Sequence, residues 1–187
     1  SFGYQVLGFG SGVAAAAPPS IDILVVAGGA SGATQHAGGG GAGGLVYKTG
    51  HELASGTQYD VVVGAGGAGQ GTYHTAGNSG YDSTWTINGG AVEFTAKGGG
   101  YGHYGIGGNG GSGGGQGASA SNERSNEIQS EQDGDSATYG FGNDGGLGTS
   151  TPNFNTGGGG GAGSAGADSN GTSGNGGTGK DLSAVFA

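Results

Sequence analysis

Runs of glycine constrain this chain more than any other feature of its sequence. The stretch from Lys97 to Gly117 holds 13 glycines in 21 residues. An α-helix does not tolerate that density, because each interior glycine costs about 1 kcal/mol relative to alanine. A β-strand is weakened as well, because glycine has no side chain to pack. The stretch is therefore either disordered or part of a packing that depends on the missing side chains.

Predicted strands alternate with these runs. Residues rich in β-branched and aromatic side chains predict strands at 20–27, 45–49, 58–63, 83–87 and 92–96. The first of them is apolar on both sides, which favours an interior position in a sheet. Most of the chain's 55 glycines, 46 of them, fall in runs at 28–44, 64–80, 98–117, 140–148 and 157–179. Discrete runs that follow strands indicate an ordered element rather than a linker.

The fold class that these patterns predict is mainly β and irregular, with almost no α-helix. We expect a small β-sheet body over residues 20–187 that continues into a packed bundle of polyglycine II helices. Such helices have no internal hydrogen bonds, so their backbone groups must bond to neighbouring helices. Glycine allows that approach, and the Ala, Ser, Asn and Tyr residues would face outward. The alternative is a small β-domain with flexible glycine-rich linkers.

Two segments differ from the rest of the domain. Residues 1–13 carry the apolar side chains Phe2, Tyr4, Val6, Leu7 and Phe9. We interpret them as a docking peptide for another protein, with an edge strand folded back on the body as the alternative. Residues 14–19, AAAAPP with its last proline before Ser20, read as a hinge because paired prolines hold the backbone extended.

Residues 119–137 are acidic and almost free of glycine, and we expect an exposed excursion between two glycine runs. A calcium site at Asp133 and Asp135 is an alternative, because alternate oxygen ligands suit Ca²⁺, but the rest of an EF-hand pattern is absent.

The amino-acid composition argues against several classes of function. The formal net charge is −9 with only four Lys and Arg, which argues against a nucleic-acid partner. There is no cysteine, so thiolate metal sites and disulfides are excluded. No apolar run approaches 18 residues, so we predict no membrane insertion. We expect no secretory signal, because no basic segment followed by an apolar run opens the sequence.

Motifs for catalysis are weak. GxGxxG matches arise by chance in such a chain, and no amphipathic helix follows the first to hold a pyrophosphate. The histidines His36, His51, His74 and His103 form no ligand-spaced pair, and no serine lies in a nucleophile elbow. We therefore predict a protein that is not an enzyme, with no catalytic residue, no cofactor and no metal.

Aromatic residues that interrupt the glycine runs are the binding candidates. They are Tyr73, His74, Tyr101, His103 and Tyr104. Such side chains give a large contact area at low entropic cost, so they suit contact with a receptor protein or glycan. The alternative is that they only cap the faces of the bundle.

The motifs ILVVAGGASG, GGGGAGG, YDVVVGAGGAG, FTAKGGG and the closing GGGGGAGSAGAD resemble the glycine-rich domain of bacteriophage tail-fibre and virion-surface proteins. The plan is similar to that of the tail-fibre-tip adhesins of T-even-like phages, and the opening FGYQVLGFGSG is similar to the N-terminus of marine phage structural proteins. The resemblance covers about residues 20–179 and the N-terminal segment.

This resemblance implies a virion-surface location after assembly in the host cytoplasm. Residues 1–13 would attach the chain to a capsid or tail protein, and the bundle would reach a bacterial surface receptor or glycan as a tail-fibre adhesin or capsid decoration. A homo-oligomer is compatible with this reading. The alternatives are an ice-binding polyglycine II protein and a glycine-rich extracellular structural protein.

Overall fold

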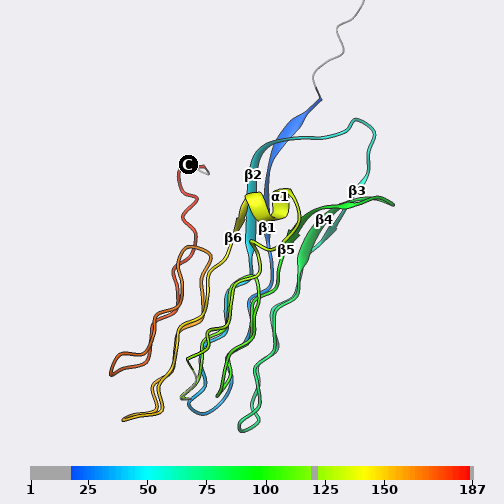
Figure 1. The fold of residues 1–187 in the computed structure, drawn as a ribbon. Coiled ribbons are helices and arrows are strands. Elements are labelled where there is room, and N and C mark those ends of the chain that lie inside the picture. The colour runs from blue at the N-terminus through cyan, green and yellow to red at the C-terminus, as the bar shows by residue number, and fades with distance from the viewer. Residues whose placement is uncertain (1–17, 119–121, 186–187) are drawn as a thin grey trace, which may run out of the picture.

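Two small antiparallel sheets stand at one end of the computed structural model, which describes residues 18–118 and 122–185 (Figure 1). The first sheet has the order β1-β2-β6 and the second the order β3-β4-β5. Their strands are β1 (Ser20–Val26), β2 (Leu45–Glu52), β3 (Tyr59–Val62), β4 (Ser83–Ile87), β5 (Val92–Ala96) and β6 (Gly140–Phe141). The described residues form one short helix, α1 (Asp135–Thr138). The mainly β and irregular class is thus confirmed, and so are the five predicted strands, whose ends shift by at most three residues.

A small hydrophobic core lies between the two sheets. Phe94 of β5 and Val46 of β2 are fully buried, and Ile23 and Val25 of β1 pack with them. Trp85 of β4 is half-buried against the same cluster. Burial of these side chains joins the sheets as two packed layers.

The prediction that residues 20–27 form an interior strand is wrong. Strand β1 pairs with β2 only, which places it at the edge of its sheet. Ile23 and Val25 face the core, whereas the alternate residues Leu24 and Val26 are exposed. The apolar composition suggested two covered faces, but only one of them is covered by the described residues.

The glycine-rich segments run from the sheets as extended legs that lie side by side (Figure 1). Most of their turns lie at the end far from the sheets, and the legs are neither α-helix nor β-strand. We call these segments the legs: residues 27–33, 36–44, 64–70, 75–82, 97–103, 107–110, 112–118, 142–148, 156–162, 163–169 and 173–180.

Backbone hydrogen bonds join the legs at intervals of three residues. Three N–H groups of leg 36–44 donate to leg 97–103: Gly38 to His103, Gly41 to Gly100 and Gly44 to Lys97, at 3.1, 2.8 and 2.7 Å. Both the donors and the acceptors are three residues apart. A β-ladder repeats every two residues and an α-helix bonds within its own segment. The legs therefore follow neither pattern.

Leg 36–44 has neighbours on further sides as well. Its carbonyl groups accept from leg 112–118, again every three residues: Ala118 to His36, Gly115 to Gly39 and Ser112 to Ala42. Leg 27–33 donates to it from Ala27 and Ala30. Contact on several sides requires glycine, because a Cβ built on Gly38 would overlap the carbonyl oxygen of Gly115. Backbone hydrogen bonding thus holds together a region with few apolar side chains.

The sequence predicted that the residues larger than glycine face outward from the legs, but some of them face inward. Ser112 and Gln116 are fully buried in leg 112–118. The Gln116 side chain accepts a hydrogen bond from Gly148 N at 2.9 Å and donates to Glu123 O at 3.4 Å. A buried side-chain amide here bonds to backbone groups of neighbouring segments, which the glycine pattern alone does not reveal.

The described part of the 119–137 excursion, residues 122–137, is only partly exposed, which corrects the prediction of an exposed excursion. Its residue Gln129 is fully buried at the junction of β5 and leg 97–103. The Gln129 amide accepts from Lys97 N at 2.8 Å and donates to Thr95 O and Ser136 O, both at 2.9 Å. Ser125 is buried too, whereas the acidic side chains Glu123, Glu131 and Asp133 are exposed. The polar composition predicted the exposed carboxylates correctly and missed the buried amide.

Two ion pairs join this excursion to the rest of the domain. Arg124 donates to Asp168 of leg 163–169 at 2.6 Å, and this bond holds the pKa of Asp168 below its usual value. Asp135 pairs with Lys48 of β2, and the hydrogen bond between them raises the pKa of Lys48. The carboxylate of Asp135, a predicted calcium ligand in the alternative reading, is thus occupied by a lysine.

Candidate binding site

The turns at the far end of the legs carry backbone in an uncommon conformation. Among the described residues other than glycine, four have positive φ angles, between 52° and 55°: Gln35, His36, His74 and Phe154. All four lie where the chain reverses between two legs. Side chains at positive φ cost of order 1 kcal/mol each, and such residues concentrate at functional sites. Three of the four have aromatic or imidazole side chains.

The rings of two neighbouring turns form a continuous stack. The Tyr73 and His74 rings lie 3.8 Å apart with an interplanar angle of 16°. The His74 ring then stacks on that of Tyr104, from the turn after leg 97–103, at 4.7 Å and 27°. Tyr73 is 58% exposed and stands at the open end of the row. We call Tyr73, His74 and Tyr104 the aromatic row.

The other two predicted residues lie close to this row and are less exposed than Tyr73 and His74. Tyr101 and His103 are half-buried, and their rings meet edge to face at 6.3 Å. The Tyr101 ring fills the space beside Gly108, where a Cβ would contact it. The structure thus brings all five predicted residues to one end of the bundle, with Tyr101 in a packing position.

Sequence reasoning missed a second ring pair at this end. His36 and Phe154 lie 5.1 Å apart, and both are exposed. The Gly38 N–H donates to His103 O, which places the His36 turn beside that of the aromatic row. Both residues could have been chosen as candidates by their position in the sequence, because they interrupt the glycine-rich sequence as Tyr73 and His74 do.

The side chains of these turns carry no formal charge. Residues 33–37, 70–76, 101–106 and 149–156 contain no Lys, Arg, Asp or Glu. Exposed tyrosine and imidazole rings offer apolar faces with a hydrogen-bonding group at the edge. The arrangement suits stacking against a sugar ring or an apolar loop better than binding a charged ligand.

Other kinds of site are absent from the described part of the chain. No group of three or more His, Cys, Asp or Glu residues in 18–118 and 122–185 is arranged to hold a metal ion. Within the same ranges no helix has the length and apolar character to cross a membrane. The predicted docking residues Phe2, Tyr4, Val6, Leu7 and Phe9 lie outside the described residues, as does most of the 14–19 hinge.

Comparison with known proteins assigns the domain at the family level. No curated protein and no solved structure matches the chain significantly. The family model described as "Glycine-rich domain" matches residues 11–185, which is nearly the whole chain. The chain belongs to this glycine-rich domain family.

Proposed function

We propose that the legs are polyglycine II helices and that their bundle is a rigid stalk for the aromatic row. The support is the three-residue interval of the hydrogen bonds between legs, which equals the repeat of this helix type. A polyglycine II helix has no internal hydrogen bonds. Leg 36–44 agrees with this, because its N–H groups donate to other legs. A bundle of this kind resists bending because backbone bonds link its legs laterally.

The function that this arrangement supports best is that of a non-enzymatic phage virion appendage. In this proposal residues 1–13 attach the chain to a capsid or tail protein, and the far end of the bundle contacts the host surface. The chain would be a tail-fibre adhesin or a capsid decoration. The phage assignment draws on the sequence resemblance. The contact surface draws on one observation, the aromatic row, in which Tyr73 and His74 are exposed and His74 has a positive φ.

Attachment to a particle is tested by immunogold electron microscopy of a phage lysate from the source. Gold on tail tips or fibres would support an adhesin, and gold spread over capsids a decoration protein. Gold on no particle would contradict the proposal and direct attention to the ice-binding alternative, which thermal hysteresis tests. Deletion of residues 1–13 should abolish incorporation into particles; unchanged incorporation would refute the docking role.

The contact surface is tested by binding of the purified protein to host cells. Replacing Tyr73 with alanine removes the exposed end of the aromatic row, and we expect at least a tenfold loss of affinity. The matched control is Tyr81→Ala, because Tyr81 is 65% exposed but lies in a leg next to the sheets. Equal binding by both variants would exclude the aromatic row as the contact surface.

A further inference from the structure

The inner face of the second sheet is covered unevenly. Trp85 of β4 is the cross-strand partner of Phe94 on one side and of Val61 on the other, so all three face the same way. Phe94 is fully buried under the first sheet, whereas Val61 is 60% exposed. Val63, two residues further along the same face, is 82% exposed. The first sheet therefore covers the inner face of the second sheet only as far as β1.

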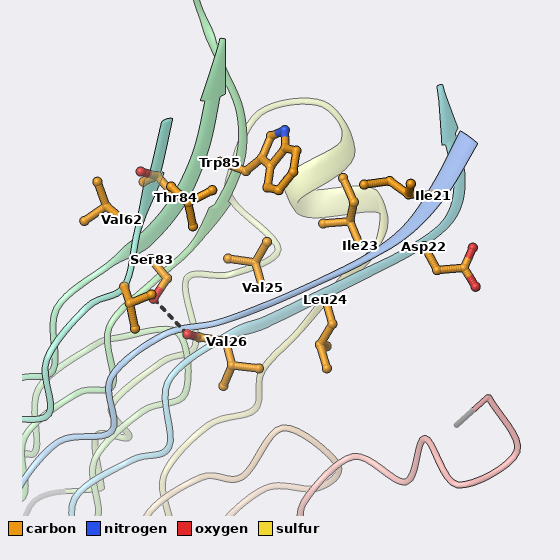
Figure 2. Close-up of a pocket in the computed structure, with 12 residues that line it drawn as sticks. Ile21, Asp22, Ile23, Leu24, Val25, Val26, Val62, Ser83, Thr84 and Trp85 are labelled. Carbon is orange, nitrogen blue, oxygen red and sulfur yellow. Dashed lines mark hydrogen bonds between the residues drawn. The ribbon is translucent and has the colours of Figure 1, made fainter. Parts of the chain in front are cut away.

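An apolar cleft of about 260 Å³ lies where the cover ends, between β1 and strands β3 and β4. Figure 2 shows Ile23, Val25 and Trp85 directed into the space between β1 and β4, with Leu24 on the other side of β1. The indole N–H of Trp85 is buried and has no hydrogen-bond partner among the described residues.

Strand β1 offers an unpaired edge to this cleft. Among the described strands it pairs with β2 alone, so its opposite edge has backbone N–H and C=O groups without a strand partner. At one end of that edge Ser83 Oγ donates to Val26 O at 2.8 Å (Figure 2). One more strand beside β1 would pair with this edge and cover Val61. The first sheet could therefore take one more strand, beside β1.

We infer that the cleft is the binding site of the chain's own segment Phe2–Phe9, added to β1 as a further strand. Phe2, Tyr4 and Val6 alternate with small or polar residues, a pattern that gives a strand one apolar face. Residues 1–19 contain no charged side chain, which matches a cleft lined mainly by Ile, Leu, Val and Trp side chains, with Asp22 as its one charged residue.

The position of the segment in the chain favours it over other occupants. The described residues begin at Pro18, two residues before β1, so the chain before it starts beside the unpaired edge. Residues 10–19 span up to about 33 Å when extended, which exceeds the length of the seven-residue β1. A tether this short gives a millimolar effective concentration, which favours the chain's own segment over a second copy.

The inference concerns the free protein and does not rest on the proposed function. Because the chain has no cysteine, engineered pairs give a clean test. Phe2, Tyr4 and Val6 are each changed to cysteine in the full chain together with Val61→Cys. Bridging needs Cα atoms within about 7 Å, and at least one pair should oxidise to a disulfide within the monomer.

The control pairs carry Val92→Cys instead. Val92 is 53% exposed, like Val61, but lies on β5 as the partner of Thr86, on the other face of the sheet. No bridge to Val61→Cys, or equal bridging to Val92→Cys, would overturn the inference. A disulfide between two copies would overturn it as well, because the occupant would then be a neighbouring chain.

Amide hydrogen exchange provides a second readout that needs no cysteine. The triple variant F2S/Y4S/V6S removes the apolar face of the segment and leaves the described residues unchanged. We expect at least tenfold faster exchange for amides of β1 than in the natural chain, with β5 unchanged. Identical β1 exchange in the two proteins would show that the segment does not cover this edge.

Discussion

At the residue scale, two residue types hold the domain together in different ways. Glycine allows close approach of backbones, as at Gly38, and a few buried amides satisfy the backbone groups that the legs leave unpaired, as at Gln129. Both contributions are specific to a position, so neighbouring residues of the same type differ in importance.

Gly38→Ala should destabilise the fold by about 1–3 kcal/mol, because its Cβ would overlap the Gly115 carbonyl and both segments are fixed by hydrogen bonds. Gly69→Ala is the matched control, since Gly69 is exposed and a Cβ there meets no atom. Urea unfolding measures both. Equal stability of the two variants would contradict the packing of leg 36–44.

Gln129→Leu should cost about 2–4 kcal/mol of unfolding free energy, because it leaves Lys97 N, Thr95 O and Ser136 O buried without their partner. Gln132→Leu serves as the control, because Gln132 lies in the same excursion and bonds only locally, to Ile128 O. Thermal unfolding of both proteins tests the difference. A Gln129→Leu variant as stable as the control would show that the excursion does not support the junction.

At the element scale, strands were predictable and their environment was not. Val and Ile content identified residues 20–27 as a strand, but composition could not show that Leu24 and Val26 lie on an uncovered face. The excursion was misjudged for a related reason. Burial of Gln129 depends on backbone groups of β5 and leg 97–103, and no local pattern encodes that contact.

The Arg124–Asp168 pair attaches the excursion to leg 163–169 and makes a pH-dependent contribution. The pKa of Asp168 is lower in the folded chain than its unfolded value of 3.8, so the ionised form favours folding. This contribution is present above pH 3.8 and is lost as the pH falls through the folded pKa. The pair is partly exposed, so its size is about 0.2–1 kcal/mol.

Asp168→Asn should therefore lower stability at pH 7 and converge with the natural chain in acid. Unfolding in urea at a series of pH values measures this, with Asp133→Asn at an exposed position as control. A constant difference between Asp168→Asn and the natural chain from pH 7 to pH 2 would exclude an electrostatic role for the pair.

At the scale of the whole molecule, a small sandwich forms one end and the turns of the legs form the other (Figure 1). The sequence indicated which aromatic residues interrupt the glycine runs, and the structure brings Tyr73, His74 and Tyr104 into one row. The position of His36 and Phe154 between glycine runs was visible in the sequence, but their contact was not, because it joins turns more than 100 residues apart in the chain. Its formation depends on the order in which the legs pack.

The central claim is that the glycine-rich legs are ordered by backbone hydrogen bonds, and amide hydrogen exchange over residues 98–117 tests it most directly. The N–H groups of Gly100, Gly108 and Gly114 all donate to carbonyl groups within the bundle. We predict exchange at least about 100-fold slower than in an unfolded chain. Exchange at random-coil rates across this stretch would contradict the account.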